Sequence, residues 1–322
     1  MRRSRKLALG ATVLASVLLL AACGKSGGGE TKASSSGGGA TVASKLILGG
    51  PPECPQRPFC IPGLKATYGV TFKSFKALDV GGAQTKAALD SGAIQIALLF
   101  STDPTILVKG WVPLEDDKHL QNAELITPVV RTAVLNDEIT TLLNNISAKL
   151  TTENILPMVK AVAVDQQDPA QVAKGFLDQN GLLPSSGQGA GKSITVGVSA
   201  TFAEQSIMAE MYAQTLEAAG YKVKRELDLA AREVSDPALE KGDIDIKAEY
   251  LASELAGPLA KAPDKASGDA QAEAAALGPL LEAHGITLLT PSQANDTNVF
   301  VVTKATADQY GLSTMSDLGK TI

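Results

Sequence analysis

The chain has 322 residues, of which 44% are hydrophobic and 20% are charged, and its formal net charge is −5. This length and composition predict a globular protein with enough residues for two domains. The acidic balance argues against a nucleic-acid-binding surface. Because the chain has only two histidines, no metal-ligand spacing and no nucleophile motif, we predict neither an enzyme nor a bound metal or cofactor.

The amino-terminal residues have the pattern of an export signal. Basic residues precede an apolar run over 7–20, which is too short to span a bilayer and is typical of a secretory signal peptide. The run ends in Leu20-Ala21-Ala22-Cys23, which resembles a bacterial lipobox. We therefore predict a signal peptide over 1–22 and a lipid on Cys23. The alternative is a plain signal peptide whose cysteine is accidental.

Residues 23–44 are rich in glycine and serine, a composition typical of a flexible tether. Loss of the four basic residues of the signal lowers the formal charge to about −9. The expected protein is thus an acidic body anchored by lipid to the extracytoplasmic face of the cell membrane.

Short apolar runs alternate with helical patterns from residue 45 onward. Strands are predicted over residues 45–48, 72–78, 93–100, 111–115, 126–130, 193–198, 223–229, 242–246, 286–289 and 298–303. Helices are predicted over residues 62–68, 81–91, 136–149, 152–162, 169–181, 199–219, 232–241, 305–310 and 315–318. The alternation indicates an α/β fold with mainly parallel sheets. Residues 184–192 interrupt it with small polar residues and predict a linker rather than a phosphate-binding loop, because they precede a strand.

The first predicted strand ends at a loop that carries two of the three cysteines, Cys54 and Cys60. With Cys23 assigned to lipid, these two form a pair, and export allows a disulfide between them to persist. A metal site is the competing interpretation. It fails because no histidine lies near and two thiolates do not complete a tetrahedral shell.

Several stretches resemble one known family. They are KLILGGPPECPQRPFC from residue 45, ITVGVSATFAEQSIMAE from residue 194, and TPSQANDTNVFVV from residue 290. They resemble the glycine betaine/choline/proline-type (OpuAC-like) substrate-binding proteins of ABC importers. The resemblance covers about residues 45–322, but the part similar to the family's second half stands first, at 45–183. It implies a two-lobed periplasmic-binding-protein-like (type II) α/β fold, circularly permuted.

The permuted order assigns each lobe two segments. Lobe 2 is expected to combine residues 45–126 with 298–322, and lobe 1 to combine 127–186 with 193–297. Residues 187–192 form the linker between the old chain ends. Such permutants can fold because the termini of compact domains often lie close together. The rival account is a fusion of two incomplete copies that do not assemble.

The resemblance also implies a ligand site between the lobes. The matching positions in this sequence are Phe202, Gln205, Tyr250, Ser253, Asn298, Phe100, Ser101, Thr102 and Asp103. The alternative roles are structural: the aromatic residues are core residues, Asp103 caps a helix, and Asn298 satisfies backbone groups. Two departures from the family pattern, Lys247 and Gln84-Thr85-Lys86, stand where members often have aromatic residues. We therefore expect that these positions alone do not supply a cage of three or four aromatics.

The resemblance implies a function in transport. The expected protein is a monomeric substrate-binding lipoprotein that delivers a small osmolyte-like solute to an ABC permease. The solute is of the glycine betaine, choline, carnitine or proline class, or a zwitterion whose carboxylate meets a lysine. The alternative is a ligand sensor or a vestigial permuted surface lipoprotein without a transport role.

Overall fold

The computed structural model describes residues 40–198, 202–229 and 231–322. Cys23, the signal peptide and most of the tether lie outside these residues, so the predictions made for them are not addressed by the structure. Among the described residues, no helix has the length and apolar character needed to cross a membrane.

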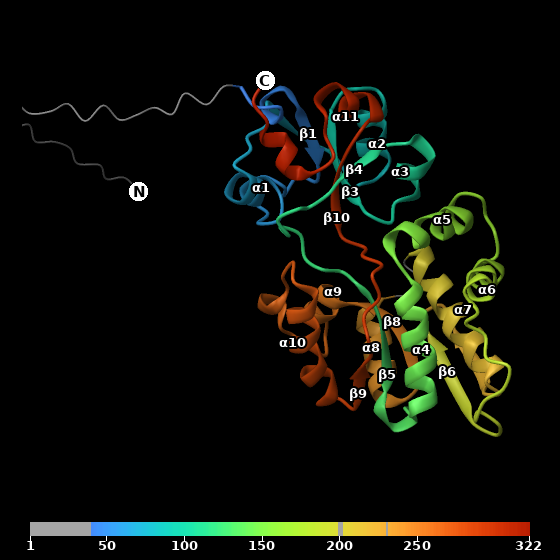
Figure 1. The fold of residues 1–322 in the computed structure, drawn as a ribbon. Helices are drawn as coiled ribbons and strands as arrows, with labels where there is room; N and C mark the ends of the chain where they lie inside the picture. Colours follow the sequence, from blue (N-terminus) through green and yellow to red (C-terminus); the bar gives the residue numbers. More distant parts are fainter. Residues whose placement is uncertain (1–39, 199–201, 230) are drawn as a thin grey trace, which may run out of the picture. The chain divides into compact units, whose positions relative to one another are not determined.

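Lobe 2 is built on a five-stranded sheet with the order β2-β1-β3-β10-β4. Figure 1 labels β1, β3, β4 and β10 of this sheet. Its strands are β1 (Ile47–Gly50), β2 (Ser74–Ala77), β3 (Ile96–Phe100), β4 (Val112–Leu114) and β10 (Asn298–Val302). Its helices are α1 (Ile61–Tyr68), α2 (Ala83–Asp90), α3 (Pro104–Lys109) and α11 (Lys304–Tyr310). Strand β1 is parallel to β2 and β3, whereas β10 is antiparallel to β3 and β4. The central strand β3 is buried along Ile96–Leu99, as its continuous apolar run predicts.

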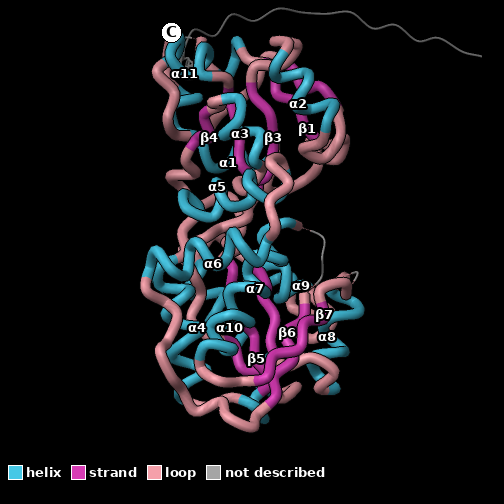
Figure 2. The backbone as a smooth tube through the Cα atoms, turned by 90° about the vertical axis from the view of Figure 1, so that its right-hand side faces the viewer, coloured by secondary structure: helices cyan, strands magenta, loops and turns pink. Residues whose placement is uncertain are grey.

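Lobe 1 is built on a second five-stranded sheet with the order β7-β6-β8-β5-β9. Its strands are β5 (Ile126–Arg131), β6 (Ser193–Gly197), β7 (Lys222–Glu226), β8 (Ile246–Tyr250) and β9 (Ile286–Leu288). Its helices are α4 (Asp137–Lys149), α5 (Thr152–Ala163), α6 (Pro169–Asn180), α7 (Ala203–Ala218), α8 (Arg232–Lys241), α9 (Leu251–Ala256) and α10 (Ala270–Glu282). Figure 2 shows the strands in two groups, each accompanied by helices. Helix α7 is buried on most of its surface, since it packs against β6, β7, β8 and the helices α4, α5 and α6.

Both sheets mix strands from the two halves of the chain. Strand β10 pairs with β3 and β4, and β5 lies between β8 and β9. The halves therefore assemble, which excludes the rival account of two copies that stay apart. In each sheet the fourth strand in spatial order, β10 or β5, is antiparallel to both of its neighbours.

Two segments join the lobes and run side by side. The first connects β4 to β5, and the second connects β9 to β10. Leu125 and Asn295 form an antiparallel bridge between them. The backbone N–H of Glu124 donates to Asn295 Oδ1 at 2.8 Å, and the backbone N–H of Asp296 donates to the Glu124 carbonyl at 3.0 Å. We call residues 115–125 and 289–297 the hinge segments.

Two boundaries differ from the expectations, and the linker keeps the exposure expected of it. Residues 41–44 belong to the folded body rather than the tether, because Thr41 pairs with Thr321 and Val42 is buried. The linker over 184–192 is mostly exposed but docked, with the Gly189 N–H donating to the Ala219 carbonyl at 3.0 Å. Strand β8 runs to Tyr250 instead of ending at Ile246, which places Lys247 inside a buried strand.

Candidate functional site

A cavity of about 520 Å³ is lined by residues of both lobes and of the hinge. Ligand pockets in proteins commonly have volumes of this order. Lobe 2, including the start of β10, contributes Arg57, Pro58, Phe59, Phe100 and Asn298. The hinge segments contribute Asn122, Glu124, Asp296 and Thr297. Lobe 1 contributes Phe202, Gln205, Ala231, Arg232, Glu233, Tyr250 and Ser253.

Four of these side chains are aromatic, and we call Phe59, Phe100, Phe202 and Tyr250 the aromatic wall. The ring of Phe202 lies 6.5 Å from that of Phe100 and 6.5 Å from that of Tyr250, centroid to centroid. Phe100 ends β3 and Tyr250 ends β8, so both stand at carboxyl ends of strands, where α/β folds hold ligands. Phe100, Phe202 and Tyr250 stand at positions named by the resemblance, and Phe59, which sequence reasoning missed, completes the set of four.

A buried carboxyl group accepts a hydrogen bond from the hydroxyl of Tyr250 and so fixes its position. Tyr250 Oη donates to Glu204 Oε1 at 2.8 Å. Burial raises the pKa of Glu204 to about 7, and the neighbouring Asp296 carboxylate adds to the shift. Burial also raises the pKa of Tyr250 well above its usual value, so its hydroxyl keeps its proton.

Carboxyl groups of the hinge form another part of the cavity. Glu124 accepts hydrogen bonds from the backbone N–H and the hydroxyl of Ser253, each at 3.0 Å, and burial raises its pKa to about 7. Asp296 accepts a hydrogen bond from the hydroxyl of Thr102, and burial raises its pKa as well. These carboxyl groups stand beside the aromatic wall, and burial disfavours their ionised forms.

Arg232 brings a positive charge to the same cavity, but it is held by buried carboxylates. Its Nε and Nη2 donate to Glu249 Oε2 at 3.1 and 2.7 Å, and Nε lies 3.2 Å from Glu254 Oε2. Its orientation is therefore set from lobe 1, independently of a ligand.

Lys247 lies in the same buried cluster and does not line the cavity. Its ammonium group donates to Asp236, to Glu249 Oε1 at 2.7 Å and to Ser235 Oγ at 3.1 Å, and the residue is 2% exposed. Burial alone lowers the pKa of Lys247, but the carboxylates outweigh this effect and the net shift is upward. Carboxylate oxygens of Asp236, Glu249 and Glu254 lie within 4.8 Å of one another; Lys247 pairs with Asp236 and Glu249, and Arg232 pairs with Glu249 and Glu254. The alternative of a zwitterion whose carboxylate meets a lysine therefore finds no support at Lys247, which does not line the cavity.

Six of the predicted site residues line the cavity: Phe100, Phe202, Gln205, Tyr250, Ser253 and Asn298. The described residues that line it do not include Ser101, Thr102 or Asp103. Ser101 Oγ donates to the Asn295 carbonyl at 2.6 Å and Thr102 donates to Asp296, so both brace the hinge. Asp103 caps α3 and forms an ion pair with Lys86 at 2.6 Å.

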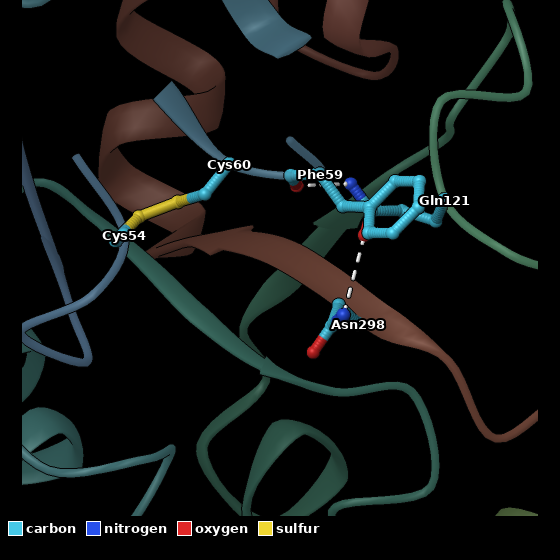
Figure 3. Close-up of a disulfide and its surroundings, with 5 residues drawn as sticks. All are labelled: Cys54, Phe59, Cys60, Gln121 and Asn298. Atoms are coloured by element: carbon cyan, nitrogen blue, oxygen red, sulfur yellow. Dashed lines mark hydrogen bonds between the residues drawn. A yellow bond between two sulfur atoms is a disulfide. The ribbon is translucent and has the colours of Figure 1, made fainter. Parts of the chain in front are cut away.

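The loop that carries Phe59 is held at both ends by a cysteine pair and at the Phe59 carbonyl by a hydrogen bond (Figure 3). Cys54 and Cys60 are buried and at disulfide distance, with Cα atoms 5.2 Å apart. Gln121 Nε2 donates to the Phe59 carbonyl at 2.8 Å, and Asn298 Nδ2 donates to Gln121 Oε1 at 3.3 Å. Asn298 thus bonds a side chain rather than the backbone.

Comparison with known proteins decides the family. The model of the OpuAC family, described as the substrate binding domain of ABC-type glycine betaine transport systems, matches residues 39–179 and 192–321. The chain belongs to the OpuAC family. The glycine betaine-binding protein YehZ of Escherichia coli is 25% identical over 133 residues, which are 39% of this chain and 44% of YehZ. The chain thus spans less than half the length of this curated relative in that match.

Solved structures of binding proteins are also similar to this OpuAC member. Apo YehZ from Escherichia coli matches with a TM-score of 0.35 and 12% identity, over 85% of each chain. An ancestral arginine-binding protein bound to arginine matches with a TM-score of 0.34 and 16% identity, over 86% of this chain and 90% of that one.

Proposed function

We propose that this OpuAC protein is an extracytoplasmic lipoprotein that binds a small quaternary ammonium solute between its lobes and delivers it to an ABC permease. The observation that carries the proposal is the aromatic wall, to which both lobes contribute. A quaternary ammonium group donates no hydrogen bonds, so a protein recognises it best through aromatic faces. Each such contact contributes about 0.5–2 kcal/mol, depending on desolvation.

The charges of the cavity support a cationic group on the ligand. Glu124 and Asp296 stand beside the aromatic wall, and binding of a cation would favour their ionised forms. Arg232 supplies a counterpart for a carboxylate, as in a betaine. The proposed ligands are therefore glycine betaine, carnitine and choline, and proline is expected to bind more weakly because it lacks the methylated ammonium.

Substitution of the aromatic wall tests this function. The mature protein should be stabilised by about 2.7 kcal/mol by a cognate ligand present at 100 times its dissociation constant, as measured by thermal or chemical denaturation. Phe202→Leu should weaken binding about tenfold in calorimetric titration, because it removes a cation–π contact but keeps an apolar side chain. Tyr310→Leu is the matched control, since Tyr310 packs on the lobe 2 core away from the cavity.

A second comparison isolates the charge of the ligand. The tert-butyl analogue of each solute, in which carbon replaces the ammonium nitrogen, should bind the wild type at least tenfold more weakly than the solute. Equal binding of solute and analogue, or no binding of any quaternary ammonium compound, would contradict the proposal.

The membrane anchor is the other part of the proposed function. The lipobox-like Leu20–Cys23 supports lipid attachment at Cys23, and export supports a disulfide between Cys54 and Cys60. Cys23→Ser should release the protein from membranes into the medium, as followed by fractionation and by incorporation of labelled lipid. The anchor would be ruled out if Cys23→Ser stays in the membrane fraction and the wild type incorporates no labelled lipid.

A further inference from the structure

Phe59 differs from the other members of the aromatic wall, because it lies in a loop instead of at the end of a strand or helix. The Cys54–Cys60 pair fixes the ends of this loop. Within it, the Arg57 N–H donates to the Glu53 carbonyl at 3.0 Å and the Cys60 N–H donates to the Arg57 carbonyl at 2.9 Å. These turn bonds do not engage the carbonyl of Phe59, which instead accepts from Gln121.

Gln121 is a buried residue of the first hinge segment, with 4% of its surface exposed. Its own backbone is fixed, because its N–H donates to Asp116 Oδ2 at 2.6 Å. The orientation of its amide is defined chemically: the Phe59 carbonyl can only accept, so Nε2 faces Phe59 and Oε1 faces the Asn298 amide. Gln121 thus links the loop to the first strand residue after the second hinge segment (Figure 3).

We propose that Gln121 is a positioning residue that holds the Phe59 ring in the aromatic wall and thereby sets the affinity for the solute. The proposal rests on the proposed function for its ligand. Gln121 is not among the described residues that line the ligand cavity, so its effect must pass through Phe59 or Asn298, which both line it. An unmade hydrogen bond at the partly buried Phe59 carbonyl would allow the loop to move away from the cavity.

The variant that tests the proposal is Gln121→Met, which keeps the length of the side chain and removes both hydrogen bonds. Its matched control is Gln95→Met. Gln95 also bridges backbone groups of lobe 2, donating to the Gly92 carbonyl at 2.8 Å and accepting from the Ile47 N–H at 3.1 Å, but it lies away from the cavity. Gln121→Met should weaken binding of glycine betaine or choline about tenfold, whereas Gln95→Met should leave the dissociation constant within about twofold.

A double-mutant cycle distinguishes positioning from a general loss of structure. Phe59→Leu alone should also weaken binding about tenfold, and Phe59→Leu with Gln121→Met should bind no more weakly than Phe59→Leu alone. Effects that multiply in the double variant, or wild-type affinity in Gln121→Met, would overturn the proposal.

Hydrogen exchange supplies a measurement that needs no ligand. In the free protein, the backbone amides of Gln56, Arg57, Phe59, Cys60 and Ile61 should exchange about tenfold faster in Gln121→Met than in the wild type, and Gln95→Met should leave them unchanged. Unchanged exchange in this loop would overturn the positioning role. If the loop exchanges faster but the wild type binds no quaternary ammonium compound, the positioning role stands and the proposed function fails.

Discussion

Lys247→Met should lower the free energy of unfolding by about 3–5 kcal/mol. The substitution leaves Asp236, Glu249 and Glu254 buried within 4.8 Å of one another, with Arg232 as their remaining ion-pair partner. Removing one partner of a buried ionic cluster is costly because the other charges stay desolvated and lose their compensation. The loss should be visible as a lower urea midpoint at pH 7, followed by circular dichroism.

Lys224→Met is the control for this substitution. Lys224 lies in β7 of the same sheet and pairs with Glu226, but its side chain is 70% exposed, so its loss should change stability by less than about 1 kcal/mol. The triple variant Lys247→Met, Asp236→Asn, Glu254→Gln should recover at least half of the free energy of unfolding that Lys247→Met loses, because fewer carboxylates are then left without a cation. Equal effects of Lys247→Met and Lys224→Met would show that the cluster is not ionised as described.

The wild type should lose stability as the pH rises, because Glu204 ionises, and Glu204→Gln should not show this loss. The pKa of Glu204 is about 7 in the folded protein and 4.5 as its ordinary value, so folding favours the protonated carboxyl. The unfolded chain gives up this proton at lower pH, and the fold is therefore destabilised progressively from about pH 4.5 to pH 7. Above pH 7 the effect reaches about 3 kcal/mol. Glutamine still accepts the hydrogen bond from Tyr250 and does not ionise.

The measurement is urea unfolding of both proteins at several pH values. The stability of Glu204→Gln relative to the wild type should be near zero at pH 4 and should rise to about 3 kcal/mol at pH 8. Glu282→Gln, at the exposed end of α10, is the control for the loss of a carboxylate. A difference between Glu204→Gln and the wild type that is constant across this range would contradict the assigned shift.

Parts of the fold and the site follow from sequence pattern. The apolar run that ends at Phe100 and the strand that ends at Tyr250 place aromatic residues at carboxyl ends of strands, where ligands are bound. Arg232 and Glu124 could not be found in this way. Arg232 is placed by its ion pair with Glu249, which lies in another element. Glu124 is placed by its hydrogen bond from Ser253, which lies far from it in the sequence.

Lys247 shows why local pattern failed at one point. The sequence Lys247-Ala248-Glu249 has the polarity of a strand end, and the strand was expected to stop before it. Burial of these charges is possible only because Asp236 and Arg232 of α8 face them. The circularly permuted order stays a prediction from the sequence resemblance, since the spatial order of the strands does not show which segment stands first in other members of the family.

The exchange of strands between the two halves also determines when each lobe can be completed. During synthesis, β1 to β4 are made early, but the place between β3 and β4 is filled only by β10. Until residues 298–302 are available, lobe 2 has two unpaired strand edges and an exposed apolar face. The first lobe to be started is therefore the last to be finished. Completion of lobe 2 should be a late event governed by contacts between distant segments, with a correspondingly slow rate.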